Sequence, residues 1–243
     1  MRSNARVTSR TRWLLTCEHA RSAIPRSYRS LGLRREHVLD HIGWDIGAHA
    51  VQRDVAARLG APWVASRWSR LLIDCNRGPE DATLIVNVSD GIAVPGNARV
   101  SDAERRRRLR EYYEPYHSAV ATMIRRACAA RDRDEAGSEV KLLSLHSFTP
   151  VFGGEERKVE IGVLFDEHEP LARRLGRALR RRGFGVRYNE PYSGRAGLIY
   201  SARKHGNAHG IEYVELEINN GLIRTPAGQR RLGREIAASL VEI

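Results

Sequence analysis

The sequence predicts an α/β protein with a mainly parallel or mixed sheet and helices on both faces of that sheet. Apolar runs of strand length alternate along the chain with segments of helical periodicity, as is typical of this class. No linker, internal repeat or long low-complexity segment divides the 243 residues, so we expect a single catalytic domain over residues 1–243. Every apolar run is far shorter than the roughly 20 residues that a bilayer crossing requires, so no membrane span is expected.

The N-terminal part is expected to begin with a strand and to end in a long loop. An apolar run predicts a strand at residues 13–17. Apolar residues at helical spacing, followed by a Gly-Ala-Pro sequence, predict a helix at residues 45–59. Two further short strands are expected at residues 63–65 and 71–75. Residues 76–100 are rich in Gly, Pro, Asn and Asp, so we expect a loop there.

The middle of the chain carries a helix start signal. Ser101 is followed three residues later by Glu104, which is the capping-box pattern and predicts a helix that runs toward Tyr113. Pro115 is expected to interrupt this helix, and a second helical segment is expected to continue to about Ala130.

The C-terminal part alternates strands and helices again. The expected strands span residues 140–145, 159–165, 186–188 and 213–218, and the expected helices span residues 171–182 and 225–241. In α/β sheets of this kind, sites form outside the carboxyl ends of the strands. Polar side chains at those ends are therefore the first candidates for a functional site.

The chain is strongly basic. Its 41 Lys and Arg against 29 Asp and Glu give a formal net charge of +12 and a pI of about 10.3. Arginine runs at residues 105–108, joined by Arg110, and at 180–182 are interpreted as solvated faces of predicted helices. They are not interleaved with aromatic residues, so nucleic acid is not an expected partner. The positive field would instead attract small anionic substrates.

Cysteine usage and the N-terminus bear on the compartment. Cys17, Cys75 and Cys128 are odd in number and widely spaced, which favours buried thiols over a disulfide framework or a zinc ribbon. The basic N-terminus leads into a short strand-like run without the apolar core or cleavage site of a signal peptide, so a cytoplasmic location is expected.

Four residues at predicted strand ends and helix starts suit the chemistry of a metal hydrolase. His19, His146 and Glu217 each lie at or just past the end of a predicted strand, and Asp45 begins a predicted helix. Zinc hydrolases combine three such ligands with an open position for water and a carboxylate that handles the proton of that water. Glu215 and Glu217 share one face of an apolar strand, so at least one must be paired or functional.

Other catalytic patterns are absent or weak. The sequence contains no G-x-S-x-G, P-loop, G-x-G-x-x-G or H-E-x-x-H motif. Cys17 lies two residues before His19, but neighbouring strand residues point to opposite faces, so a thiol nucleophile is disfavoured.

A second cluster, in the stretch SRLLIDCNRG, is expected to bind a substrate carboxylate. Arg77 ends a predicted strand, and its planar guanidinium suits bidentate pairing with a carboxylate. Arg70 and Asn76 lie beside it as further candidates. The alternative is a structural salt bridge among Arg70, Asp74 and Arg77.

Two polar, glycine-bearing loops are expected late in the chain, at residues 189–195 and 204–210. Arg195 and His205 belong to them. Each side chain either lines a substrate pocket or forms hydrogen bonds within its loop.

Ordered motifs over about residues 12–225 resemble those of the N-formylglutamate amidohydrolase family. The matching stretches are CEHA…IP (17–25), HIGWDIGA (41–48), SRLLIDCNR (69–77), SDGIAVPGN (89–97), YYEPYH (112–117), LLSLHSFTP (142–150), NEPYSG (189–194), HG (205–206) and VELEINNGLI (214–223). SRLLIDCNR and LHSFTP are the most specific of these.

The resemblance implies a zinc-dependent amide hydrolase with a three-layer fold akin to zinc exopeptidases and muramoyl–alanine amidases. It implies that His19, Asp45 and His146 bind Zn²⁺ and that Glu217 is the general base, which activates the zinc-bound water and protonates the leaving amine. Arg77, together with Arg70, would hold the substrate's carboxylate. The implied substrate is a small anionic N-formyl or N-acyl amino acid, within amino-acid metabolism.

The sequence departs from the family pattern in two motifs. Many family members have E-I-R-x-D where this chain has Glu217-Ile218-Asn219-Asn220-Gly221, and P-H-S-G where it has Cys17-Glu18-His19-Ala20. Glu215 is an alternative base, and His41 or His49 is an alternative ligand. Three other functions therefore stay open: a peptidoglycan-fragment amidase, a degenerate protein that binds small carboxylates, and a basic nucleic-acid-binding module.

Overall fold

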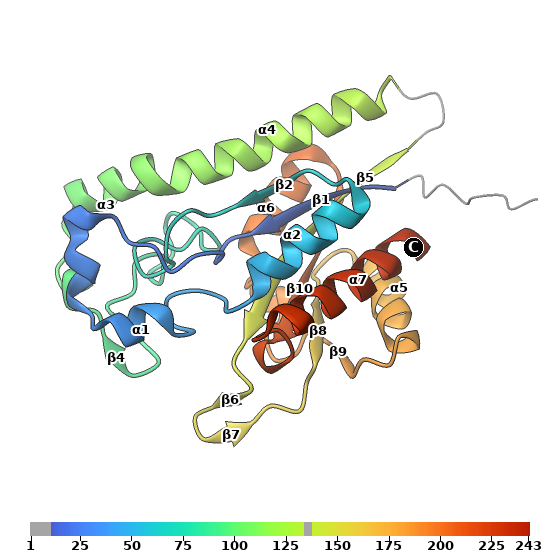
Figure 1. Ribbon diagram of the computed structural model, residues 1–243. Helices are drawn as coiled ribbons and strands as arrows, with labels where there is room; N and C mark the ends of the chain where they lie inside the picture. Colours follow the sequence, from blue (N-terminus) through green and yellow to red (C-terminus); the bar gives the residue numbers. More distant parts are fainter. Residues whose placement is uncertain (1–10, 134–137) are drawn as a thin grey trace, which may run out of the picture.

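The computed structural model (Figure 1) describes residues 11–133 and 138–243. A six-stranded sheet forms the centre of the protein. Its strands, in spatial order, are β2 (Trp63–Ala65), β1 (Thr11–Cys17), β5 (Glu139–Phe148), β10 (Glu212–Asn219), β8 (Ile161–Leu164) and β9 (Val186–Tyr188). Neighbouring strands are parallel except β8 and β10, which are antiparallel. The predicted mixed α/β class is confirmed.

Helices cover both faces of this sheet. Helices α2 (Ala48–Leu59), α5 (Glu169–Arg181) and α7 (Pro226–Glu242) pack on one face, and α4 (Glu114–Arg131) and α6 (Tyr200–His209) pack on the other. Side chains alternate between the two cores along each strand, so that Leu143 of β5 joins the first core and Leu142 joins the second. This alternation explains why buried strands read as continuous apolar runs.

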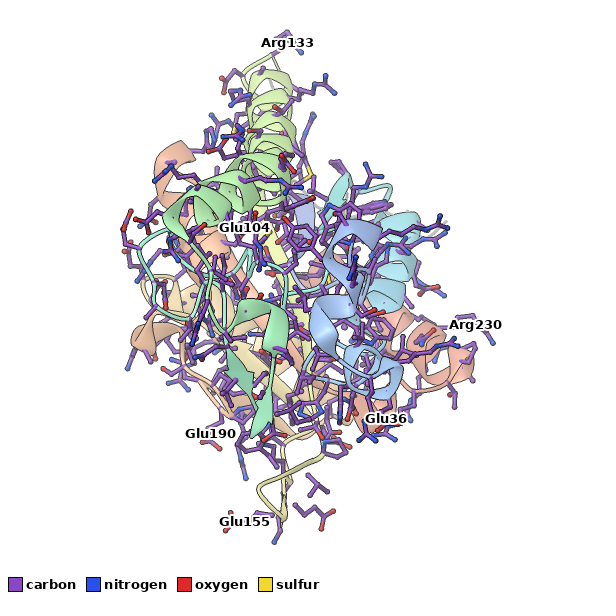
Figure 2. All side chains as sticks on the ribbon, turned by 90° about the vertical axis from the view of Figure 1, so that its left-hand side faces the viewer. Glu36, Glu104, Arg133, Glu155, Glu190 and Arg230 are labelled. Carbon is purple, nitrogen blue, oxygen red and sulfur yellow. The ribbon has the colours of Figure 1, made fainter. Side chains whose placement is uncertain are left out.

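Shorter elements connect the layers at the carboxyl edge of the parallel strands. They comprise helices α1 (Arg35–Leu39) and α3 (Asp102–Arg108), the hairpins β3 (Val88–Ser89) with β4 (Ile92–Ala93) and β6 (Val151–Phe152) with β7 (Glu155–Glu156), the 3₁₀ turns Arg26–Gly32, Pro95–Asn97, Gly194–Ala196 and Asn220–Leu222, and the π-helical turn Leu109–Tyr113. The β6–β7 hairpin projects from the body, with Glu155 at its tip (Figure 2).

The prediction of a strand at residues 71–75 is wrong. This segment forms turns, in which the Leu72 amide donates to the Ser69 carbonyl at 3.0 Å and the Arg77 amide donates to the Asp74 carbonyl at 3.2 Å. Leu71 and Leu72 are nonetheless fully buried, in a small cluster beside the main sheet. An apolar run indicates burial, and it does not distinguish a strand from a buried turn.

Two predictions about helices and loops are also wrong. Pro115 does not break the helical path, because the π-helical turn Leu109–Tyr113 leads directly into α4 and the residues before Pro115 keep helical dihedral angles. Residues 204–210 are not a loop, because most of them belong to α6, which ends at Gly210 in the left-handed conformation. The predicted loop at residues 76–100 contains the β3–β4 hairpin.

Arg108 departs from the solvated arginine face that its run predicts. It is buried, and it donates to the Leu72 carbonyl at 3.0 Å, to Asn97 Oδ1 at 2.7 Å and to Glu104 Oε1 at 2.9 Å. It therefore ties the turn at residues 71–75 to α3 instead of facing solvent.

Cys17 and Cys75 are buried and Cys128 is partly buried, and all three are free thiols, as predicted. Within the described ranges, no helix combines the length and the apolar character that a bilayer crossing needs.

Candidate active site

His19 and Asp45 meet at the carboxyl end of β1. The Asp45 amide donates to the His19 carbonyl at 2.9 Å, which fixes the Asp45 turn against the segment that follows β1. Asp45 does not begin the helix itself, since α2 starts at Ala48. Gly47 lies between Asp45 and the start of α2 and has a φ of 85°. A Cβ there would lie 2.5 Å from the Ile223 carbonyl oxygen, so only glycine fits this turn.

Asp45 lies between two histidines. Its Oδ1 is 3.4 Å from His19 Nδ1, and its Oδ2 is 2.8 Å from His146 Nδ1. All three residues are buried, with exposed fractions of 5%, 3% and 1% for Asp45, His19 and His146. One nitrogen or oxygen atom from each lies within 4.8 Å of the others, as the ligands of one metal ion must.

A second carboxylate holds the other nitrogen of each histidine. His19 Nε2 is 2.7 Å from Asp74 Oδ1, and His146 Nε2 is 2.8 Å from Glu18 Oε2. Such outer carboxylates fix the tautomer and the orientation of metal-binding imidazoles. Both rings therefore donate from Nε2 and present Nδ1 to Asp45.

Glu18 is a site residue that the sequence analysis did not identify. It is buried, and it accepts hydrogen bonds from Tyr116 Oη and Ser144 Oγ, both at 2.5 Å, as well as from His146. Burial by itself would raise the pKa of Glu18, but these hydrogen bonds and the charge of His146 outweigh it and lower that pKa. Its only signal in the sequence is a carboxylate that directly follows an apolar strand.

The residues present fit a divalent metal. His19 Nδ1 is buried and, among the described residues, has no hydrogen-bond partner. An orphaned imidazole nitrogen beside a carboxylate and a second imidazole matches the donor set that Zn²⁺ prefers.

Glu215 and Glu217 lie on one face of β10, as predicted, and reach the same site. Glu215 Oε2 is 3.5 Å from His146 Nε2 and 3.4 Å from Asn76 Nδ2. Glu217 pairs across the strands with Gly162, where a Cβ would lie only 2.1 Å from the Glu190 carbonyl oxygen.

Burial sets the protonation of both glutamates. It raises the pKa of Glu215 to about 7, against the opposing charge of His146. Burial, together with repulsion from Asp45 and Glu215, raises the pKa of Glu217 well above its usual range. A carboxyl group with a pKa near 7, as Glu215 has, can exchange protons near neutral pH.

A cavity of about 320 Å³ opens over these groups. Arg70 and Arg77 both line it. Arg70 is bound to Asp74 Oδ2 at 2.9 Å, so the predicted structural salt bridge exists for this pair. Arg77 instead donates to Thr83 Oγ1 at 3.1 Å and to the Asn76 carbonyl at 3.0 Å. Among the described residues, no carboxylate lies within ion-pair distance of Arg77.

Asn76 lines the cavity and joins the turn at residues 71–75 to α6. Its Nδ2 donates to the Leu198 carbonyl at 3.0 Å, and its Oδ1 accepts from the Ser201 amide at 2.9 Å. Asn76 thus supports the cavity wall.

Two candidate residues lie away from the cavity. Arg195 is largely exposed and pairs with Glu169 at 2.7 Å. His205 is buried in α6, where its Nε2 is 2.9 Å from His117 Nδ1.

Among the described residues, neither alternative ligand falls in the cluster of His19, Asp45 and His146. His41 lines the cavity, but it contacts Asp40 at 3.2 Å and Asp90 at 3.1 Å. His49 instead contacts Gln52 at 2.9 Å. Burial raises the pKa of the Cys17 thiol well above its usual range, which opposes the thiolate that nucleophilic attack requires.

A larger cavity, of about 1010 Å³, lies at the other end of the sheet, between the start of β1, the end of α2 and α4. Its described lining includes no histidine, aspartate or glutamate. The larger cavity is therefore not the candidate active site, because the titratable groups line the smaller one.

The profile of the N-formylglutamate amidohydrolase family matches residues 11–224 of this chain. Gene product Atu2144 from Agrobacterium tumefaciens, whose crystal structure is known, shares 36% sequence identity with this chain. The two structures have a TM-score of 0.85, and the match covers 95% of this chain and 90% of that one. The N-formylglutamate amidohydrolase from Ralstonia eutropha JMP134 is 20% identical, with a TM-score of 0.66 over 95% of this chain and 91% of that one. No protein of curated function matches the sequence.

Proposed function

The chain belongs to the N-formylglutamate amidohydrolase family, and we propose that it is a zinc-dependent hydrolase of the amide C–N bond in an N-formyl or other N-acyl amino acid. The observation that carries this proposal is the convergence of His19, Asp45 and His146, with two buried glutamates beside them. His19 and His146 would hold the ion through Nδ1, and Asp45 would hold it through a carboxylate oxygen. A bound Zn²⁺ supplies a Lewis acid that polarises the amide carbonyl and makes water more acidic.

Glu217 is the proposed general base. Its Oε2 is buried and lacks a hydrogen-bond partner among the described residues, so the carboxylate is available to a water molecule and not committed to a structural contact. It takes a proton from the attacking water and returns it to the leaving amine. Glu215 contacts Asn76 and His146, which favours a supporting role in orienting these groups.

Arg77 is proposed to bind the substrate's carboxylate. It lines the cavity, and its Nε and Nη1 are held by Thr83 and by the Asn76 carbonyl. The rest of the guanidinium fork is left to bind an anion. The net charge of +12 favours the approach of such a substrate.

Matched glutamate variants test this assignment. Glu217→Gln should bind zinc as the wild type does and lose about 10²–10⁴-fold in kcat, which is the usual contribution of general acid–base catalysis. Glu215→Gln, two residues away on the same face of β10, should lose much less of its kcat. Metal analysis and turnover of N-formyl amino acids by the two variants provide the measurement.

The reverse pattern, with the larger loss in Glu215→Gln, would make Glu215 the base. Wild-type protein that neither retains zinc nor takes it up would contradict the metal-dependent mechanism as a whole.

A further inference from the structure

Three aromatic side chains form one wall of the cavity over the site. Phe148 ends β5, Phe152 belongs to the projecting β6–β7 hairpin, and Tyr192 lies in the loop after β9. The Arg157 guanidinium lies 5.6, 4.5 and 5.3 Å from the centroids of the Phe148, Phe152 and Tyr192 rings. It also donates to Tyr192 Oη at 3.2 Å.

These contacts hold the aromatic wall together. Cation–π attraction acts within about 6 Å of a ring centroid, so one guanidinium ties together rings from three separate segments. Arg157 does not itself line the cavity. Its guanidinium therefore supports the rings from outside the cavity lining.

Phe152 is exposed although it faces the cavity. Its exposed fraction is 46%, whereas Phe148 beside it is 3% exposed. A large apolar side chain left uncovered at the mouth of a cavity is typical of a binding surface, because a ligand that covers it removes apolar area from water.

The cationic side chains that line the cavity limit how many carboxylates a substrate can present. Within the part of the chain that the structure describes, the basic lining residues besides His19 and His146 are His41, Arg70 and Arg77. His41 and Arg70 already contact carboxylates of the protein. Arg77 alone among these lining residues lacks a carboxylate partner, so the cavity offers an uncommitted guanidinium to one carboxylate.

We infer that the preferred substrate is an N-acyl amino acid with a single carboxylate and an aromatic or large apolar side chain. This inference rests on the proposed function. The carboxylate binds Arg77, and the side chain packs against Phe152 and Tyr192. A side-chain carboxylate, as in N-formylglutamate, would lose its hydration against the aromatic wall, and once Arg77 is occupied no unpaired cation among the described lining residues is left for it. The cavity volume of about 320 Å³ suits a small metabolite.

Substrate comparison on the zinc-loaded wild type tests the inference. We expect kcat/KM for N-formyl-L-phenylalanine to exceed that for N-formyl-L-glutamate by at least about ten-fold, the scale of discrimination that one side-chain pocket gives.

A pair of variants on the hairpin locates the preference. Phe152→Ala should lower kcat/KM for N-formyl-L-phenylalanine by about ten-fold and leave that for N-formyl-L-alanine nearly unchanged. Val151→Ala is the control, because Val151 lies beside Phe152, is 51% exposed and does not line the cavity. It should leave both values unchanged.

Calorimetric binding to the Glu217→Gln variant separates this inference from the proposed function. Tighter binding of N-formyl-L-phenylalanine than of N-formyl-L-glutamate supports the inferred specificity even if turnover is slow. Equal or tighter binding of N-formyl-L-glutamate, or a higher kcat/KM for it, overturns the specificity and leaves the hydrolase proposal standing. Wild-type protein that binds phenylalanine derivatives but hydrolyses no N-formyl amino acid overturns the hydrolase proposal instead.

Discussion

The direction of two imidazole rings decides what the site can bind. Asp74 and Glu18 each accept from the Nε2 of one histidine, so that both Nδ1 atoms face Asp45. Without these two carboxylates, either ring would be free to flip or to adopt the other tautomer. The proposed ligand set therefore depends on five residues, of which two would not touch the metal.

Glu18→Gln tests this role of the outer carboxylates. The amide keeps the size of the side chain but removes the charge that orients His146, so we expect zinc affinity to fall by about 10–100-fold, as is usual for outer-shell changes. Competition with a chromophoric zinc chelator measures the affinity.

Glu36→Gln is the control for this experiment, since Glu36 lies exposed on α1 and pairs only with Arg34 among the described residues. An unchanged zinc affinity in Glu18→Gln would show that Glu18 does not orient the ligand.

At the scale of secondary structure, α4 and α6 meet through a buried histidine pair. His117 Nδ1 and His205 Nε2 are 2.9 Å apart, so at least one of these nitrogens must be unprotonated. Burial, with the neighbouring charges of His205 and Lys204, lowers the pKa of His117 to about 3. Burial and Lys204 lower the pKa of His205 to about 4. Glu18 opposes both shifts, and His209 adds to the shift of His205.

These depressed values make stability depend on pH. Between the unfolded pKa of about 6.5 and the folded values, the unfolded chain binds protons that the folded protein does not, so the free energy of unfolding falls as the pH falls through this range. We expect each histidine to contribute about 1–2 kcal/mol to the loss between pH 7 and pH 5. His205→Gln should therefore lose less stability over this interval than the wild type, as measured by urea denaturation at both pH values.

His37→Gln is the matched control, because His37 lies on α1 and is not part of the pair. A His205→Gln variant whose loss equals that of the wild type would show that the pair does not titrate on unfolding.

Secondary structure was predictable where a local pattern reflects the final environment. The capping box at Ser101 does start α3, with Ser101 Oγ accepting from the Glu104 amide at 3.2 Å. The apolar residues at 71–75 are buried as expected, but from turns: Leu71 and Leu72 pack in a small separate cluster, and Ile73 and Cys75 pack in the core on the α4 and α6 face of the sheet. Helix α6 carries a polar, glycine-bearing sequence, and its glycine, Gly206, lies so close to Tyr213 that a Cβ would clash at 2.1 Å. The close approach of α6 to β10 explains why a glycine lies inside this helix.

At the scale of the whole molecule, the proposed metal site joins segments that are far apart in sequence. Two histidines and Asp45 come from three different segments around the carboxyl edge of β1 and β5. An ion held by all of them would bind the folded protein and not the unfolded chain, so it would stabilise the fold by mass action.

Removing the metal should therefore lower Tm. At a free zinc concentration about 100 times Kd, binding contributes about 2.7 kcal/mol. For a chain of this size, this corresponds to roughly 5–10 °C. We expect dialysis against a chelator to lower Tm by this amount and added zinc to restore it, as followed by thermal unfolding. His146→Ala should show the lower Tm in both conditions, and a wild-type Tm that is insensitive to chelator and to zinc would contradict the proposed site.

The sequence by itself determined the mixed α/β class and placed His19, His146 and Glu217 near the carboxyl ends of strands, although His146 lies inside β5 and Glu217 inside β10. It could do so because alternating burial and polar strand ends are local consequences of a buried sheet. Tertiary structure alone decided that Glu18 joins the site while Arg195 pairs with Glu169 and lies elsewhere. Such outcomes depend on which segments meet across the fold, and neither spacing nor composition encodes the distance between residues that are far apart along the chain.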